Sequence, residues 1–466
     1  MRAFWLIPRM SYEMAPADVP GIPITSQSAV RFTDTLPGAA DVVVIGGGVI
    51  GVSTALFLAR AGQKVVLIEK GRLAGEQSGR NWGWIRQQGR DPDELPIMME
   101  ANTHWQAFAR ETNVDFGLQQ TGVTYLAETQ EDLAGYEDWL TSVSGSGVDS
   151  RILSASEVTD LIPGMSRTYA GALYTPSDLK AEPWKAVPAL GEIAQREGVA
   201  IRENCAARGL DIVAGRVAGV VTENGLVKSD RVVLAAGAWS SLFLRAHGVK
   251  IPQLSVRATV AATEALPAVY KGGGADKRIA FRHRADGGYS LAAGGFHELF
   301  VGPDAFRAVP KFLTQLKADP FGTRFFPFAP RGFPDAWGTP RRWLLDAESP
   351  FERQRVLNPS PNRAKLRQLT RDFAQLFPDL GPVRLKNAWA GMIDTMPDVV
   401  PVVDHVTDLP GLVLGTGMSG HGFGIGPGMG RVLADLALGR PAGHDLSRFR
   451  LKRFVDGTPM VLGPSV

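Results

Sequence analysis

The first long apolar run of the chain is Asp41-Val42-Val43-Val44-Ile45. A continuous β-branched run without polar alternation is typical of a strand buried on both faces of a parallel sheet. Small and apolar residues from Val52 to Ala61 predict a helix that ends at Gly62, and Lys64 to Ile68 predicts the next strand. This order of strand, helix and strand predicts an α/β domain with a parallel sheet.

Similar pieces recur only much later in the chain. Asp230 to Gly237 and Leu412 to Leu414 read as further buried strands, and Met429 to Leu438 reads as a late helix. Between them, Arg282 to Ala293 alternates like a hairpin and Arg363 to Phe377 has helical spacing. We therefore predict a Rossmann-like cofactor domain assembled from discontinuous segments, with an α+β substrate domain built on an antiparallel sheet in the gaps. The predicted division is an N-terminal arm at 1–37, a cofactor domain at 38–90, 150–245 and 385–450, and a substrate domain at 91–149 and 246–384.

Composition narrows the class of protein. The chain has 466 residues, 44% hydrophobic and 21% charged, which suits a folded enzyme of two domains. A net charge of +3 with scattered arginines gives no support for nucleic-acid binding. The single cysteine, Cys205, excludes an intrachain disulfide and any multi-cysteine metal or iron–sulfur site, and it fits a reducing, cytoplasmic location.

The N-terminal segment and the proline-rich loop region give little information about function. The apolar run within Met1 to Met10 is too short to span a bilayer, so we expect neither a transmembrane segment nor a signal peptide. The stretch to about Pro37 is rich in proline and small residues, which predicts a surface arm with little helix. The sequence does not identify the surface that this arm contacts. A second subunit of a homo-oligomer is one of the alternatives. The proline-rich stretch from Asp319 to Pro350 gives no readable pattern.

A glycine motif follows the first strand at once. Gly46, Gly48 and Gly51 have the G-x-G-x-x-G spacing, in which the glycines allow a tight turn, approach of a diphosphate, and close packing of helix on strand. Glu69 ends the next strand, where a carboxylate accepts hydrogen bonds from ribose hydroxyls. The competing interpretation is a plain structural turn, but the strand and helix around the motif favour a nucleotide. A carboxylate at this position disfavours NADP and does not separate NAD from FAD.

Three further segments decide between those cofactors. They are Ser78-Gly79-Arg80-Asn81, then Ala235-Ala236-Gly237-Ala238-Trp239-Ser240, and finally Trp389 to Met392 with Met396-Pro397-Asp398 and Gly417 to Phe423. With the glycine motif, they resemble the FAD-dependent D-amino-acid-oxidase superfamily, which includes glycine oxidase, sarcosine oxidase and amino-acid dehydrogenases. The resemblance covers most of the chain, and the run from Asn81 to Arg90 is similar to bacterial L-amino-acid oxidases and deaminases.

The resemblance implies noncovalent FAD, since Cys205 lies outside the segments that would approach the flavin. A glycine-rich segment before a helix is suited to stabilising the negative charge that flavin reduction creates. The residues that we expect at the cofactor are Gly46, Gly48, Val49, Ile50, Gly51, Glu69, Lys70, Ser78, Gly79, Arg80, Asn81, Ala207, Gly237, Trp239, Gly391, Asp398, Gly420, His421, Gly422 and Phe423.

A carboxylate substrate is best held by a guanidinium. Arg86 ranks first because it follows the segment 78–81, which the resemblance places beside the flavin and which we call the flavin loop. Its neighbours Trp82 and Trp84 could exclude water. Arg282 and Arg284, with Tyr289 on the expected hairpin, rank second. For most arginines a surface charge or an ordinary ion pair is the more frequent role. Trp389 is a candidate pocket wall or core residue, and His421 is a candidate chemical or structural residue.

The expected reaction is oxidation of an amino acid to its imino acid by hydride transfer from Cα, followed by hydrolysis to a 2-oxo acid and ammonia. Electrons would pass to O2, giving hydrogen peroxide, or to another acceptor, and L-amino acids are slightly favoured. The alternatives are a D-amino-acid dehydrogenase, an oxidase of secondary amines such as sarcosine or proline, and a 2-hydroxy-acid dehydrogenase. A flavin-binding protein without turnover is a further alternative.

Overall fold

The computed structural model describes residues 23–463 apart from 296 and 321. It contains a six-stranded sheet whose central strands are the predicted ones, and all of its pairings are parallel except that of the edge strand β21. In spatial order the strands are β21 (Val402–His405), β22 (Leu412–Thr416), β13 (Val232–Leu234), β1 (Val42–Ile45), β2 (Val65–Ile68) and β9 (Ala200–Arg202).

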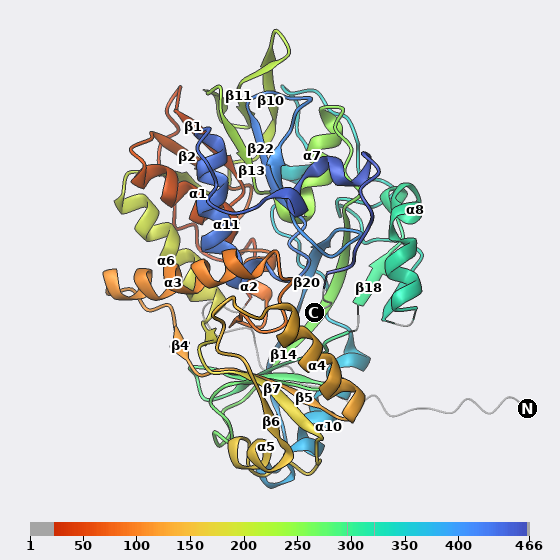
Figure 1. Cartoon of the computed structure of the whole chain (residues 1–466). Helices are drawn as coiled ribbons and strands as arrows, with labels where there is room; N and C mark the ends of the chain where they lie inside the picture. Colours follow the sequence, from red (N-terminus) through yellow and green to blue (C-terminus); the bar gives the residue numbers. More distant parts are fainter. Residues whose placement is uncertain (1–22, 296, 321, 464–466) are drawn as a thin grey trace, which may run out of the picture.

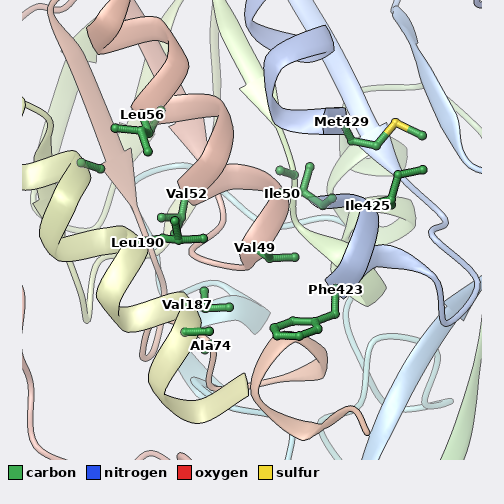
Figure 2. Packing of buried hydrophobic residues seen from close by; sticks show 14 of the residues in the cluster. Val49, Ile50, Val52, Leu56, Ala74, Val187, Leu190, Phe423, Ile425 and Met429 are labelled. Carbon is green, nitrogen blue, oxygen red and sulfur yellow. The ribbon is translucent and has the colours of Figure 1, made fainter. Parts of the chain in front are cut away.

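Helices cover one face of this sheet. Successive strand side chains point to opposite faces, so Val42 and Val44 of β1 face the helices while Val43 and Ile45 face a second layer. The helical layer contains α1 (Val49–Arg60), α3 (Leu95–Glu111), α6 (Pro183–Arg196) and α11 (Gly422–Ala437). Figure 2 shows α1 packed between α6 and α11 through Val52, Leu190 and Ile425.

A small antiparallel sheet forms the second layer. Its strands are β10 (Ala207–Val213), β11 (Arg216–Thr222) and β12 (Gly225–Lys228), and α7 (Ser240–Ala246) packs into the same core. The predicted pieces around the glycine motif, including the buried strands near 232 and 412, are therefore confirmed as parts of one layered α/β unit.

A ten-stranded sheet forms the other end of the molecule (Figure 1). Its strands, in chain order, are β5 (Val123–Ala127), β6 (Arg151–Ser154), β7 (Gly171–Thr175), β14 (Leu254–Thr263), β15 (Gly273–Ala275), β16 (Ala280–His283), β17 (Tyr289–Ala292), β18 (His297–Phe300), β19 (Thr323–Phe326) and β20 (Leu385–Thr395). Three short strands pair separately: β3 (Trp84–Ile85), β4 (Gln119–Gln120) and β8 (Leu179–Lys180).

The remaining helices are α2 (Gln77–Arg80), α4 (Gln130–Ser142), α5 (Ala155–Leu161), α8 (Pro303–Ala318), α9 (Pro350–Arg353) and α10 (Arg363–Leu376).

The predicted hairpin and helix of this region are confirmed. β16 and β17 pair antiparallel around a turn in which Gly287 has φ +82°, and α10 occupies the expected helical stretch. The strands β6, β7 and β20 fall inside 150–245 and 385–450, yet they pair in the ten-stranded sheet. The division into two domains stays a prediction.

The late helix begins earlier than the sequence predicted. α11 starts at Gly422 instead of Met429 and contains Pro427. The glycine-rich segment was expected to precede the helix, but glycines of α11 are sites of close packing: a Cβ at Gly426 would lie 2.5 Å from Val49, and one at Gly430 would lie 2.4 Å from Ser53. Tertiary packing against α1 therefore overrides the low helix propensity of glycine.

The N-terminal arm can be described only from residue 23 onward, and its first 22 residues lie outside the described part. Between 23 and 37 it has almost no regular structure, as expected. It is fixed by two arginines that follow β2: Arg72 donates to the carbonyls of Ser26 and Ser28, and Arg80 donates to the carbonyl of Ile24. The stretch from 319 to 350 contains β19, and its residue Phe333 packs into the core behind the six-stranded sheet.

Candidate active site

A long cavity runs between the two large sheets. Its walls come from the carboxyl ends of β1, β2 and β13, from the N-terminal ends of α1 and α11, and from the middle of β14 and β20. This position, at the carboxyl edge of a parallel sheet, is the usual one for a nucleotide cofactor.

The glycine turn forms one end of the cavity. Gly46 has φ +115°, and a Cβ there would lie 2.4 Å from the carbonyl oxygen of Ala235, so only glycine fits. A Cβ at Gly51 would lie 2.0 Å from the carbonyl oxygen of Gly46, which shows how closely α1 packs on the turn. Because the N-terminal end of α1 opens into the cavity, its dipole suits a diphosphate.

Glu69 lies beside this turn. Its two carboxylate oxygens accept backbone N–H groups of Gly47 at 2.8 Å and Gly71 at 2.7 Å. Burial raises the pKa of Glu69, and the neighbouring Lys70 and those two N–H groups oppose the rise. Each oxygen keeps a further lone pair, so the carboxylate can accept ribose hydroxyls. Cys205 lies at this nucleotide end, where its N–H donates to the carbonyl of Glu69.

The flavin loop, residues 78–81, and the start of α11 line a further part of the cavity. Trp389 donates its indole N–H to the carbonyl of Arg80 at 2.8 Å, so this fully buried tryptophan supports the loop and does not line the cavity. Burial lowers the pKa of Arg80 to about 10, and its guanidinium is held by the carbonyls of Gly75 and Ala390 and by Asn358. Glu69 and the glycine turn thus form a nucleotide end of the cavity, and the residues at the start of α11 and around Arg86 form the part that we expect to take the flavin ring, here called the ring end.

Most of the predicted cofactor residues line this cavity. They are Gly46, Gly48, Val49, Ile50, Glu69, Lys70, Ser78, Arg80, Asn81, Ala207, Gly237, Trp239, Gly391, Gly420, His421, Gly422 and Phe423. Gly51 and Gly79 lie behind it. Asp398 lies elsewhere, since its carboxylate forms a buried ion pair with Arg453 near the C-terminus.

Arg86 is the arginine that the structure brings to the ring end. It is 4% exposed, lines the cavity, and lies with its guanidinium carbon 5.3 Å from the ring centre of Tyr125. In the described part of the chain it forms no ion pair; one Nη donates to the carbonyl of Gln88. A buried guanidinium that faces a cavity without an anionic partner is suited to an anionic ligand.

The second-ranked residues are used elsewhere. Arg282 forms a bidentate ion pair with Glu182, at 2.9 and 3.0 Å, and donates to the carbonyl of Trp82. Arg284 donates to the carbonyls of Tyr289 and Thr263. The Tyr289 hydroxyl accepts the N–H of Val269, and its ring packs on Phe373 at 5.0 Å. These side chains support the hairpin and do not line the cavity.

Several polar residues of the site were not predicted from the sequence. Arg90 and Asp394 line the cavity, and Glu94 is hydrogen-bonded to His421. Arg90 lies four residues beyond Arg86, a spacing that could have drawn attention to it. Glu94 is 327 positions away from His421, so the sequence carried no signal for that pair.

The fold and this cavity define a protein that binds a nucleotide-linked cofactor at the carboxyl edge of a parallel sheet. The family model described as FAD dependent oxidoreductase (DAO) matches residues 41–436. The chain belongs to this family of FAD-dependent oxidoreductases, which confirms the predicted cofactor, FAD. Noncovalent attachment of the flavin stays a prediction.

Comparison with known proteins gives matches along most of the chain. The chain is 27% identical over 454 residues to the mitochondrial sarcosine dehydrogenase of Homo sapiens, covering 94% of this chain but 44% of that protein. The D-amino acid dehydrogenase of Paramagnetospirillum magneticum is 25% identical over 89% of the chain and 99% of its own length. The chain therefore spans less than half the length of the human relative.

Solved structures are closer in length. The L-amino acid deaminase from Proteus myxofaciens, in complex with anthranilate, has a TM-score of 0.87 and 28% identity, covering 92% of this chain and 97% of that one. The L-amino acid deaminase from Proteus vulgaris has a TM-score of 0.85 and 29% identity, covering 91% and 99%. In the part of the chain that can be described, no helix has the length and apolar character needed to cross a membrane.

Proposed function

We propose that the protein oxidises the α-amino group of a free amino acid, with L-amino acids favoured. The observation that carries the proposal is Arg86, a buried guanidinium without an ion-pair partner in the described chain, facing the ring end of the cavity. An α-carboxylate on Arg86 would make a charge-assisted, bidentate contact. The similarity to two L-amino acid deaminases supports the L series.

In this mechanism the protein positions the substrate and excludes water. FAD held by the glycine turn, Glu69 and the start of α11 would supply the two-electron acceptor for the substrate hydride. Arg86 fixes the carboxylate, so that the Cα–H bond is held toward the ring end of the cavity. Trp82 and Trp84 line the same region, with ring centres 5.3 Å apart, and shield it from solvent. Water then hydrolyses the imino acid to a 2-oxo acid and ammonia.

The test is an anaerobic titration of the purified holoprotein, followed by its visible flavin spectrum. We expect a panel of L-amino acids to bleach the flavin and the matching D-amino acids to leave it oxidised. Bleaching by D-amino acids alone would reverse the stereochemistry. A flavin that stays oxidised with both panels would overturn the proposal.

A secondary amine is the second candidate substrate, because the sarcosine dehydrogenase of Homo sapiens matches nearly the whole chain. Sarcosine is N-methylglycine, so it offers Arg86 the same carboxylate as glycine and differs from glycine only by the methyl group on nitrogen. Sarcosine and proline therefore belong in the same titration. Reduction by them, with no reduction by primary amino acids, would favour this candidate.

We further propose O2 as the electron acceptor, with hydrogen peroxide as its product. Enzyme reduced anaerobically by its substrate is mixed with air-saturated buffer, and we expect the oxidised spectrum to return with one peroxide formed per flavin. A flavin that stays bleached in air, but is reoxidised by a soluble quinone, would show that the protein is a dehydrogenase.

A further inference from the structure

A buried polar cluster lies next to Arg86 at the ring end of the cavity. His421 directly precedes α11 and Glu94 directly precedes α3, and the imidazole Nδ1 lies 3.2 Å from Glu94 Oε2. Their side chains are 1% and 0% exposed. Arg90 connects the cluster to the substrate arginine, since its Nε donates to the Arg86 carbonyl at 3.0 Å. Two long helices therefore bring a carboxylate and an imidazole together beside the expected carboxylate site.

Three polar atoms of this cluster have no hydrogen-bond partner within the described residues. They are His421 Nε2, Glu94 Oε1 and Arg90 Nη1. Leaving a buried polar atom unpaired costs about 1–3 kcal/mol, so three in one place are unusual for a purely structural cluster. His421 and Arg90 line the cavity. A ligand in the cavity is the natural partner for His421 Nε2 and Arg90 Nη1.

The hydrogen bond to Glu94 determines what His421 can offer. A carboxylate only accepts hydrogen bonds, so Nδ1 of His421 carries the proton and donates it to Glu94. Nε2 of the neutral ring then has a free lone pair and is an acceptor. A zwitterionic amino acid whose carboxylate lies on Arg86 presents an ammonium group, which is a donor.

We propose that His421 takes a proton from the substrate ammonium group and that Glu94 positions the imidazole for this step, an inference that rests on the proposed function. One N–H bond of the ammonium breaks and an Nε2–H bond forms, while the electron pair stays on the substrate nitrogen. The Cα–H bond then breaks with its two electrons leaving as hydride to FAD, and the nitrogen lone pair forms the C=N bond. Hydride loss needs that lone pair, so an ammonium cannot react.

The charges around His421 fit this role. Burial, together with the positive charge of Arg90, lowers the pKa of His421 to about 4, so the ring is neutral before substrate arrives. Burial alone would raise the pKa of Glu94, but His421, Arg90 and Arg86 lower it, so Glu94 is a carboxylate. Asp178 and Tyr125 also lie close enough to Arg86 and Arg90 to interact with their charges.

Substrate binding changes that balance. Arg86 is one of the groups that lower the proton affinity of His421. A substrate carboxylate on Arg86 neutralises this effect and adds negative charge, which raises the proton affinity of Nε2. Arg90, which the substrate carboxylate does not neutralise, lowers the pKa of an ammonium group next to it. The carboxylate contact therefore raises the proton affinity of Nε2 and favours proton transfer from a substrate that carries both groups.

The experiment compares wild-type holoenzyme with His421→Asn by anaerobic rapid mixing, across pH 6 to 10, with a saturating amino acid that reduces the wild type. We expect the limiting rate constant of flavin reduction to fall about 10²-fold at pH 7 in the variant. It should recover as the pH approaches the pKa of the free ammonium group, because the substrate then arrives deprotonated. Glu94→Gln should show the same recovery with a smaller loss.

Two controls separate this role from a structural one. His444→Asn removes another imidazole that contacts a carboxylate, Glu100, outside the cavity, and should leave the pH profile unchanged. Binding of a carboxylate without an amine, such as propionate, should perturb the flavin spectrum equally in wild type and His421→Asn. If His421→Asn does not retain FAD, Glu94→Gln decides the question.

An unchanged pH profile in a variant that binds FAD and propionate normally would overturn the proposal. A loss of rate that stays constant from pH 6 to 10 would also overturn it, since it would indicate mispositioning alone. Failure of the proposed function looks different, because then no amino acid reduces the wild-type flavin at any pH.

Discussion

Two buried arginines, Arg86 and Arg282, differ in their charge partners. Arg282 has a bidentate carboxylate in Glu182, whereas Arg86 has no ion-pair partner in the described part of the chain and faces the cavity. The same residue type can therefore serve stability at one position and ligand binding at the other. Burial alone does not separate these roles, since both side chains are almost inaccessible to solvent.

Replacing Arg86 should affect binding more than folding. For Arg86→Ala we expect KM for the amino acid to rise about 10²-fold or more, because a buried charged contact is worth about 2–5 kcal/mol. Arg86→Lys should recover part of this loss, since it keeps the charge and loses the planar fork. Steady-state kinetics and a propionate titration of the flavin spectrum measure the change.

Arg282→Ala is the matched control for that variant. It leaves Glu182 buried without its partner, so the free energy of unfolding should fall by about 3–5 kcal/mol. KM of the folded enzyme should change far less than in Arg86→Ala. The opposite pattern, with KM altered by Arg282→Ala and not by Arg86→Ala, would move the carboxylate site to the hairpin.

Asp178 should make stability depend on pH near neutrality. Burial raises its pKa to about 7, although the N–H groups of Gln87 and Gln88 and the charge of Arg86 oppose the rise. The unfolded carboxyl loses its proton near pH 4, so the contribution to folding falls as pH rises from about 4 to about 7 and is then constant. The full loss corresponds to about 4 kcal/mol.

Asp178→Asn removes this titration. The amide keeps an oxygen that can accept the backbone N–H of Gln87, whose nitrogen lies 2.6 Å from Asp178 Oδ1 in the wild type. We expect the thermal midpoint of the variant, relative to wild type, to increase between pH 5 and pH 8. Parallel midpoints across that range would mean that Asp178 is ionised in the folded protein at pH 5 as well.

At the scale of elements, the glycine turn and α1 form the most constrained junction. Gly51→Ala would place a methyl group 2.0 Å from the Gly46 carbonyl oxygen and push α1 away from the turn. We expect the purified variant to retain at least tenfold less FAD, measured as the ratio of flavin to protein absorbance. Gly135→Ala is the control: Gly135 lies in α4 with open space at its Cβ position, and its FAD content should be normal. Normal FAD in Gly51→Ala would show that the junction can relax.

Elements with one strong local pattern could be predicted from the sequence. The β-branched run of β1, the α1 segment behind the glycines and the β16–β17 hairpin all appear where expected. The predicted start of α11 was wrong because the glycines of this helix pack against α1. A local sequence pattern cannot reveal such a contact between distant segments.

Side-chain direction and long-range pairs were the other limits. Tyr289 was placed on the correct hairpin, but its contacts with Val269 and Phe373 depend on how distant segments meet. The contact between Glu94 and His421 forms because α3 and α11 lie side by side. Neither segment alone predicts that the two helices pack together.

At the scale of the whole molecule, the cavity lies between two sheets, and each sheet is built from several separate segments of the chain. Val260 of β14 and Ile393 of β20 form one wall, and Ile45 of β1 and Thr416 of β22 belong to the other. Figure 1 shows β14 and β20 between the six-stranded sheet and the far end of the molecule. A cofactor in this cavity therefore contacts both parts at once and should stabilise their arrangement.

Removal of FAD should consequently lower the stability of the entire chain. A ligand that binds only the folded state adds about 2.7 kcal/mol at a concentration of 100 times its Kd, so the thermal midpoint should rise by a few degrees as FAD is returned to apoprotein. FMN lacks the adenosine part that Glu69 and the glycine turn would hold, and should stabilise much less. Equal stabilisation by FMN would mean that the nucleotide end contributes little to binding. A midpoint independent of FAD, in protein whose spectrum shows bound flavin, would mean that the cofactor does not join the two sheets.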